Sequence, residues 1–416
     1  MRSLAAAALA LGLALPHAAR GDMFDGPLGI SDLRNASGTA WQPDATPMNA
    51  VHFMKRDWML MVHGELFAGY DFQATRRGDD ALFAPNWGML MAERELGDGQ
   101  LALRTILSLE PATVGRGGYP LLLQSGESLS GEPLHDLQHP HDFFMEVAAL
   151  YRRALTEDVG VELYVAPAGE PALGPPGFPH RRSSMSNPVA PLGHHWQDAT
   201  HISFGVLTAG VFNRFAKLEA SWFNGREPDE NRWDFDLRTP DSYAARLSLN
   251  PTPELSLQVS GGHLKSPEKL EPDVGITRIT ASFTHDVRLG ESGNVATTFA
   301  WGENWAEGHP ATPAFLLETN VELDEHHTPF ARLEWVRKTG HDLALRESLE
   351  DQQFDVGSLT LGYLYDFDPL WGAVVPGVGG SANVSVFDRG LEPAYGHRTG
   401  WGFQLFFRLT APRLRM

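Results

Sequence analysis

The chain has 416 residues, a formal net charge of −19 and no cysteine. The acidic balance argues against nucleic acid as a partner, because phosphate binding requires Lys and Arg. The lack of cysteine excludes disulfides, thiolate metal sites and Cys nucleophiles. The chain also contains 42 glycines, and 42% of its residues are hydrophobic. This composition is typical of an all-β protein with many turns.

The first residues predict a secretory signal peptide. Arg2 supplies a positive charge, residues 4–15 form an apolar run, and Ala19 and Gly21 offer small residues for cleavage. The run is too short for a transmembrane helix, which needs about 20 apolar residues. We assign residues 1–21 to the signal peptide. Residues 22–57 then form an extended N-terminal segment that either stays in the periplasm or enters the bore.

From residue 58 onward, apolar and polar residues alternate, which predicts β-strands. Near the end of the chain, for example, Trp401, Phe403 and Leu405 alternate with Gly402 and Gln404. The pattern recurs about sixteen times. The predicted strands lie near 58–72, 81–96, 99–110, 142–153, 157–166, 199–212, 216–226, 239–250, 253–264, 275–287, 293–304, 314–323, 329–338, 354–367, 378–388 and 398–409.

The links between these strands alternate between tight turns and long loops. The long links are 111–141, 167–198, 227–238, 265–274, 305–313, 339–353 and 389–397, and only 368–377 breaks the alternation. Outer-membrane barrels have short periplasmic turns and long extracellular loops. We therefore predict an all-β fold, a transmembrane antiparallel β-barrel of about 16 strands (14–16) in the cell outer membrane. It covers residues 58–410, and residues 411–416 form a C-terminal tail.

The inward face of the predicted strands carries charges of both signs. They include Glu146, Arg152, Arg246, Arg278, Glu318, Arg332 and Glu334. A soluble β-sandwich could not bury so many charges, because each unpaired ion costs several kcal/mol. A barrel of this size encloses a water-filled bore, where they cost little. The charges then line a channel and set its selectivity, with a modest preference for cations.

Two of the long loops are rich in histidine. The first holds His135, His139, His141 and Asp142, and the second holds His194, His195 and His201. Both clusters lie where an outer loop re-enters a strand, so we expect them to converge at the barrel mouth. Imidazoles with a few carboxylates suit a transition metal such as Cu, Zn, Ni or Fe. The alternative is that these side chains hydrogen-bond to one another and hold the loops folded.

Several blocks of the sequence resemble a family of proteobacterial outer-membrane β-barrel proteins that has no settled activity. The blocks are Gly-Glu-Pro-Leu-His-Asp-Leu-Gln-His-Pro-His-Asp-Phe-Phe-Met-Glu at 131–146 and His-His-Trp-Gln-Asp-Ala-Thr-His at 194–201, with shorter ones at 126–128, 169–176 and 225–230. The resemblance covers the chain from about residue 55 and implies a barrel. Through an association with heavy-metal or copper resistance, it also favours metal ligands. One departure is that the chain continues past Phe407 instead of ending on an aromatic residue.

No catalytic residue is assigned. His201 and Ser203 resemble the His-x-Ser pair of lipid-hydrolysing outer-membrane barrels, and residues two apart in a strand share a face. Ile202 and Phe204 are expected to face lipid, however, which turns His201 and Ser203 inward, away from membrane lipid.

The predicted function is a porin-like channel or capture protein for a small polar solute. The specific hypothesis is that this solute is a transition-metal ion bound by the His-rich loops at the barrel mouth. One alternative is a metal-dependent enzyme housed in the barrel. Another is a structural or assembly barrel whose C-terminal tail contacts a periplasmic protein. The expected partners are outer-membrane lipid, the solute or metal ion, and either that periplasmic protein or two further copies in a homotrimer.

Overall fold

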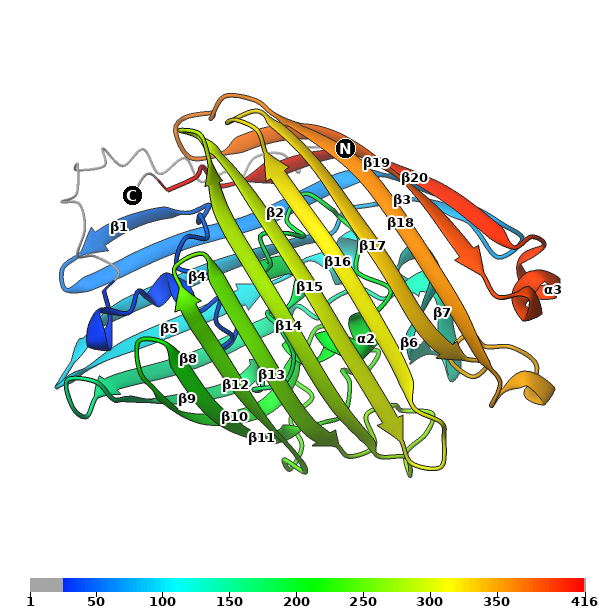
Figure 1. Ribbon diagram of the computed structural model, residues 1–416, viewed down its shortest axis with the longest axis horizontal. Coiled ribbons are helices and arrows are strands. Elements are labelled where there is room, and N and C mark those ends of the chain that lie inside the picture. Colours follow the sequence, from blue (N-terminus) through cyan, green and yellow to red (C-terminus); the bar gives the residue numbers. More distant parts are fainter. Residues whose placement is uncertain (1–24, 415–416) are drawn as a thin grey trace, which may run out of the picture.

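One closed antiparallel β-sheet dominates the computed structural model, which describes residues 25–414 (Figure 1). The predicted signal peptide lies outside the described residues. Each strand pairs with its neighbours along the chain, and β20 (Thr399–Thr410) pairs with β2 (Trp58–Ala74), which closes the sheet. The result is a barrel of 16 strands, as predicted from the alternation.

The other strands follow in chain order. They are β1 (Val51–Lys55), β3 (Asp80–Phe83), β4 (Asn86–Leu96), β5 (Gly99–Leu107), β6 (Tyr119–Leu129), β7 (Glu132–Gln138), β8 (Phe144–Ala154), β9 (Gly160–Gly169), β10 (Ser203–Phe212), β11 (Ala216–Asn224), β12 (Ser242–Thr252), β13 (Leu255–Leu264), β14 (Ile276–Leu289), β15 (Gly293–Ala306), β16 (Thr312–Glu322), β17 (His327–Thr339), β18 (Gln353–Asp366) and β19 (Val375–Phe387). β3 and β4 form one row beside β2, and β1 continues the row of β20. β6 and β7 form a separate hairpin.

The connections differ between the two ends of the barrel. At the short-turn end, Gly97 (φ 62°) and Gly290 (φ 63°) begin tight turns in a left-handed conformation that favours glycine. The longest connection at this end covers residues 367–374. The long-loop end carries loops 108–143, 170–202, 225–241, 265–275, 340–352 and 388–398. In outer-membrane barrels the long loops face the cell exterior.

The outward face of the barrel is apolar. Along β20, Trp401, Leu405 and Phe407 are 53%, 61% and 68% exposed, whereas Gln404 and Arg408 on the other face are buried. Exposed leucines continue this belt around the other strands, among them Leu163, Leu247, Leu317, Leu333 and Leu359. A closed barrel pairs its backbone groups internally and presents such a belt to lipid.

The helices are short and belong to the loops. They are α1 (Glu110–Thr113), α2 (His194–Gln197) and α3 (Glu392–Tyr395). Within residues 25–414, no helix has both the length and the hydropathy to cross a membrane. The chain is also helical at Ala199–His201, so β10 begins at Ser203, later than the strand start predicted at residue 199.

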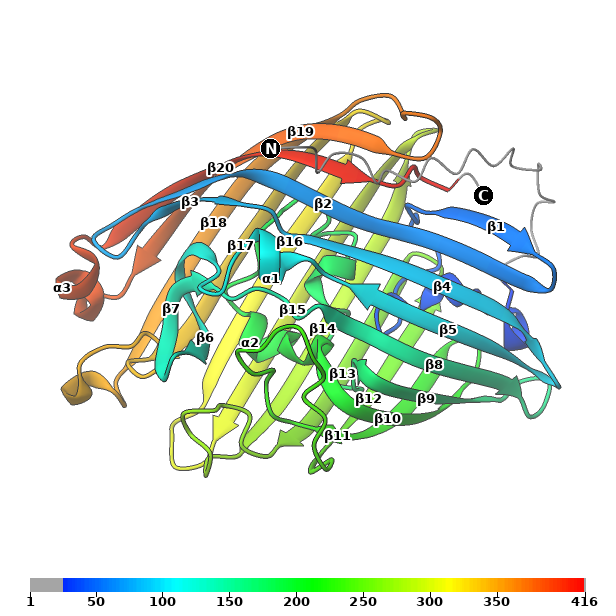
Figure 2. The ribbon, with the colours of Figure 1, turned by 180° about the vertical axis from the view of Figure 1, so that it is seen from behind.

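Three segments occupy the bore. Residues 25–50 enter at the short-turn end, where Asp32 forms an ion pair with Arg152 and Lys217 donates to the Thr39 carbonyl (2.5 Å). Loop 170–202 and the β6–β7 hairpin enter from the long-loop end (Figure 2). Almost every residue of loop 170–202 is buried. Protein therefore fills much of the bore that the sequence predicts to be water-filled. The sequence could not show this, because polar segments that fold inward have the same composition as exposed loops.

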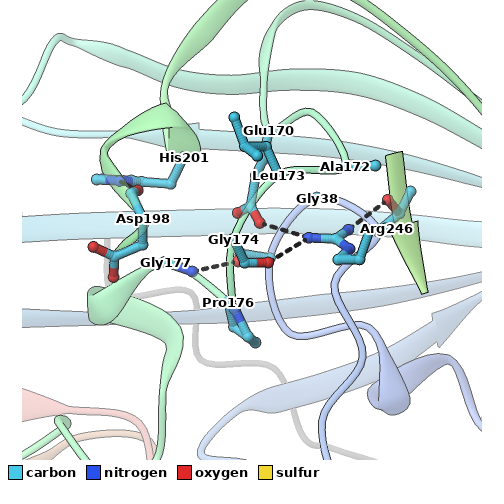
Figure 3. A network of polar contacts seen from close by, with 12 residues as sticks. Gly38, Glu170, Ala172, Leu173, Gly174, Pro176, Gly177, Asp198, His201 and Arg246 are labelled. Carbon is cyan, nitrogen blue, oxygen red and sulfur yellow. Dashed lines mark hydrogen bonds and ion pairs between the residues drawn. The ribbon is translucent and has the colours of Figure 1, made fainter. Parts of the chain in front are cut away.

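The predicted lumen charges hold these segments. Arg246 donates to the Gly174 carbonyl (3.1 Å) and lies 3.5 Å from the Glu170 carboxylate (Figure 3). Arg332 donates to the Val189 carbonyl (2.8 Å). The remaining charges also have partners: Arg278 contacts the His195 carbonyl (2.5 Å), Glu318 contacts Arg181 (2.8 Å), Glu334 contacts the Leu192 N–H (2.6 Å), Arg152 contacts Asp32, and Glu146 contacts Arg104 (2.8 Å). These charges are thus paired inside the protein and do not border an open channel.

The C-terminal tail, described as far as Leu414, lies against the N-terminal segment. Arg413 bridges to Asn49, and the Leu414 N–H donates to the Met48 carbonyl (2.8 Å). The C-terminal tail therefore lies beside residues 48–49 at the short-turn end of the barrel.

Candidate metal centre

Five histidines from two loops come together inside the long-loop end. His139 and His141 follow β7, His194 and His195 lie in α2, and His201 ends the helical turn before β10. The ring centroids of His139 and His195 are 5.6 Å apart, and those of His194 and His195 are 5.2 Å apart. One ligand atom from each of these three residues lies within 4.8 Å of the other two. The two loops thus converge as the sequence predicts, although inside the barrel wall.

His141 and His201 extend this cluster. The His201 ring lies 5.1 Å from that of His194 and 5.3 Å from that of His141. The Phe178 ring packs against all three, at 5.3 to 5.8 Å. Because α2 packs against β15 and its Trp196 donates to Thr312 (2.9 Å), the barrel wall fixes the position of the cluster.

Each of the five imidazoles has an oxygen acceptor at Nδ1. The acceptors are the Pro140 carbonyl for His139 (3.3 Å), Glu110 for His141 (2.9 Å), Asp198 for His194 (2.7 Å), Glu227 for His195 (2.9 Å) and the Asp198 carbonyl for His201 (2.8 Å). The Glu127 carboxylate also lies 3.2 Å from the His139 Nδ1 atom. An acceptor at Nδ1 requires the proton to be on that nitrogen, so Nε2 carries the lone pair. Carboxylates that orient metal-binding histidines act in this way.

The Nε2 atoms of four of these residues, His139, His141, His195 and His201, are buried without a hydrogen-bond partner. All four residues are at most 8% exposed and line one cavity of about 20 Å³. A cavity of this volume holds one water-sized particle. Buried polar atoms are almost always paired, so these nitrogens point to a ligand that accepts lone pairs.

Burial keeps the imidazoles of His139, His194 and His201 neutral. Burial lowers the pKa of His194 to about 4, although the Asp198 carboxylate opposes this shift. Burial, together with neighbouring histidines, lowers the pKa values of His139 and His201 well below their ordinary value. Neutral imidazole is the form that binds a metal ion.

The turn before the hairpin tip places one of the orienting carboxylates. Glu127 has a left-handed backbone (φ 63°), and its carboxylate forms an ion pair with Arg232 as well as contacting His139. Gly126 has a φ of 115°, and a Cβ there would collide with the His195 ring. The sequence Gly-Glu at 126–127 therefore fits this site in both conformation and space.

The remaining predicted ligands differ in position. Asp142 lines the same cavity and lies 3.4 Å from Arg232. His135 lies apart, because its side chain is 40% exposed and its Nδ1 contacts Asp136 (3.1 Å). His135 is therefore not a member of the cluster. His201 and Ser203 do not contact each other through their polar atoms, since Ser203 donates to the Thr200 carbonyl (3.1 Å) and His201 contacts the Asp198 carbonyl (2.8 Å).

The orienting carboxylates are the part of the site that the His pattern does not reveal. Glu127, Asp198 and Glu227 all fall in the sequence blocks singled out above. Asp198 follows His194 by four residues, a spacing that places the two side chains together on one helical turn, but nothing in the spacing of Glu127 or Glu227 assigns them to a histidine. Glu110 lies outside those blocks, in α1, and contacts the backbone N–H of His141 (2.8 Å) as well as its ring. Only the fold brings Glu110, Glu127 and Glu227 to the imidazoles.

Solved structures with a similar fold are those of outer-membrane proteins, porins among them. OmpF of Salmonella typhi in complex with daunomycin has a TM-score of 0.51 at 9% identity, covering 86% of this chain and 100% of its own. An anion-selective porin from Comamonas acidovorans has a TM-score of 0.50 at 10% identity, covering 85% and 99%. A loop L8 deletion mutant of Vibrio cholerae OmpT has a TM-score of 0.49 at 9% identity, covering 85% and 99%. No protein family and no curated protein matches the sequence.

The closed 16-strand sheet and its lipid-facing belt define an outer-membrane β-barrel with a porin-like fold. Within the described residues, this barrel combines a largely filled bore with a buried histidine cluster at its long-loop end.

Proposed function

We propose that the protein captures a divalent transition-metal ion at the outer end of a porin-like barrel. The observation that carries this proposal is the set of unpartnered, buried Nε2 atoms of His139, His141, His195 and His201 around one small cavity. His139, His194 and His195 supply the primary ligands, since one ligand atom from each lies within 4.8 Å of the other two.

The chemistry of the ligands favours Zn²⁺ or Cu²⁺. Three imidazoles with carboxylates behind them form a common zinc-binding set, with Zn–N distances of about 2.0–2.1 Å. The rings therefore draw together slightly when the ion binds. Asp142, His141 or His201 can complete the coordination, because they line the same cavity. No thiolate is available to favour a softer metal, as the chain has no cysteine.

Capture is better supported than free diffusion through a wide pore. Loop 170–202 and residues 25–50 occupy the bore and are bound to its charged wall by Arg246, Arg332 and Lys217. An ion that reaches the histidines must therefore displace or pass these segments to move inward. This obstruction separates the protein from porins with a continuous aqueous bore.

The enzyme alternative has less support. The cavity at the histidines measures about 20 Å³ and the adjoining outer cavity about 80 Å³. These volumes hold an ion with a few waters, whereas pockets for drug-sized ligands measure about 300–1,000 Å³.

Metal content after refolding tests the proposal. The wild type, His139→Ala, His195→Ala and the control His397→Ala, an exposed loop histidine, are dialysed against equal concentrations of Zn²⁺ or Cu²⁺ and analysed by mass spectrometry. We expect about one tightly held ion in the wild type and the control, and loss of that ion in the other two variants. Equal metal content in all four proteins would refute the proposal.

A further inference from the structure

One cavity lies between the outer loops and the histidine cluster. It has a volume of about 80 Å³ and lies at the long-loop end, between the β6–β7 hairpin and loops 265–275 and 340–352. His195 and Glu227 line it and also line the smaller histidine cavity. The His195 side chain therefore borders both cavities, and its Nε2 atom is buried without a hydrogen-bond partner.

A second cluster of metal-binding side chains lines the same outer cavity. Glu268 and Glu271 come from loop 265–275, and His341 comes from loop 340–352. The Nε2 atom of His341 lies 3.8 Å from Glu268 and 3.7 Å from Glu271, and their ligand atoms are within 4.8 Å of one another. The Glu268 side chain is 33% exposed, and the Glu271 and His341 side chains are each 25% exposed, so water reaches all three.

The two clusters differ in the strength of metal binding that they support. The outer cluster offers two carboxylates and one imidazole in contact with water, which suits a partly hydrated ion. The inner cluster offers mainly buried imidazoles, which suits a dehydrated transition-metal ion. An ion gains affinity as it moves from the first set of ligands to the second.

The charge of the cavity lining also favours cations. Its acidic residues are Glu127, Glu227, Glu268, Glu271 and Asp342, and its basic residues are Lys269 and Arg278. Clefts lined by one sign of charge attract counter-ions and raise association rates by about 10- to 1,000-fold.

We propose that Glu268, Glu271 and His341 form an outer transfer site that accepts a hydrated divalent metal ion and passes it through the cavity to His195. This inference rests on the proposed function of the histidine cluster. It adds a second, weaker site and a direction of loading from the cell exterior.

Loading kinetics separate the two sites. Zn²⁺ uptake is followed by stopped-flow mixing with a chromophoric chelator, at low and high salt, for the wild type, Glu268→Gln/Glu271→Gln and His341→Gln. The matched control is Asp234→Asn, an exposed carboxylate of the Asp229, Asp234 and Asp236 cluster, which does not line the cavity. We expect at least about tenfold slower uptake in the two outer-site variants at low salt, with the amount bound at equilibrium unchanged.

Each outcome decides the inference. Uptake rates within twofold of the wild type, or an equal slowing in Asp234→Asn, would overturn the transfer site and leave the histidine site intact. Two results together support both the histidine site and the outer transfer site. Equilibrium binding is lost only in His139→Ala and His195→Ala, and the uptake rate falls only in Glu268→Gln/Glu271→Gln and His341→Gln. A wild type that takes up no Zn²⁺ would overturn the proposed function and this inference together.

Discussion

Replacement of Glu227 by Gln is the cleanest test of the orienting carboxylates. The Oε1 atom of Glu227 lies 2.9 Å from the Nδ1 atom of His195, and its Oε2 atom is buried without a hydrogen-bond partner. Glu127 and Asp198 also form ion pairs with Arg232 and Arg181, so changing them would disturb the fold as well. The Glu227→Gln change keeps the size of the side chain and removes its charge.

The expected change in Zn²⁺ affinity follows from the role of the contact between Glu227 and His195. The carboxylate fixes the His195 tautomer and raises the basicity of its Nε2 atom, and loss of such a partner weakens metal binding by about 10- to 100-fold. This range corresponds to about 1.4–2.7 kcal/mol of binding free energy. We expect a value near the lower end, because the glutamine Oε1 atom can still accept the Nδ1–H hydrogen bond.

Competitive titration with a chromophoric chelator measures this change in the Kd for Zn²⁺. The control is Glu230→Gln in the same loop, whose carboxylate pairs with half-exposed Lys269 at 2.9 Å and is not expected to alter the Kd. If Glu227→Gln binds Zn²⁺ within twofold of the wild-type Kd while His195→Ala loses binding, the carboxylate does not orient its histidine and the reasoning fails.

Four further changes probe the site and the filled bore. Gly126→Ala should lower the affinity for Zn²⁺ at least tenfold and leave the circular dichroism spectrum unchanged. The reason is that the left-handed backbone costs about 1–3 kcal/mol for a non-glycine residue and the new Cβ atom displaces the His195 ring. An affinity equal to that of the wild type would contradict the tight packing of Gly126 against His195. Zn²⁺ at 100 times its Kd should stabilise the protein by about 2.7 kcal/mol, seen as a chelator-reversible rise in Tm that is absent in His139→Ala. Replacing residues 171–192 with a short Gly-Ser linker should raise single-channel conductance in planar bilayers, and unchanged conductance would mean that this segment is not the obstruction. Arg332→Met removes hydrogen bonds to Ser184 (2.6 Å) and to the Val189 carbonyl (2.8 Å), so loop 170–202 should become cleavable by protease in intact cells. Protease resistance equal to that of the wild type would argue that other contacts hold the loop in the bore.

The barrel itself is determined by local sequence pattern. Alternation in segments such as 401–409 directs one face to lipid and the other inward, and short turns such as that at Gly97 fix which strands are neighbours. These signals operate between residues close in the chain, so the fold class and most strands follow from them. The two His-rich loops stand out for the same reason, because their composition is local.

The content of the bore depends on tertiary structure. Arg332 and Val189 are far apart in the chain, as are His195 and Glu227, and no periodicity relates them. A polar loop in water and a polar loop bonded to charges inside a barrel have the same composition, so the sequence leaves open how far these segments fill the bore. The sequence by itself determined the barrel and the histidines as ligand candidates. Only the closed barrel decided that His135 lies outside the cluster and that Glu110, Glu127 and Glu227 reach the imidazoles, because such contacts exist only once the wall has brought the loops together.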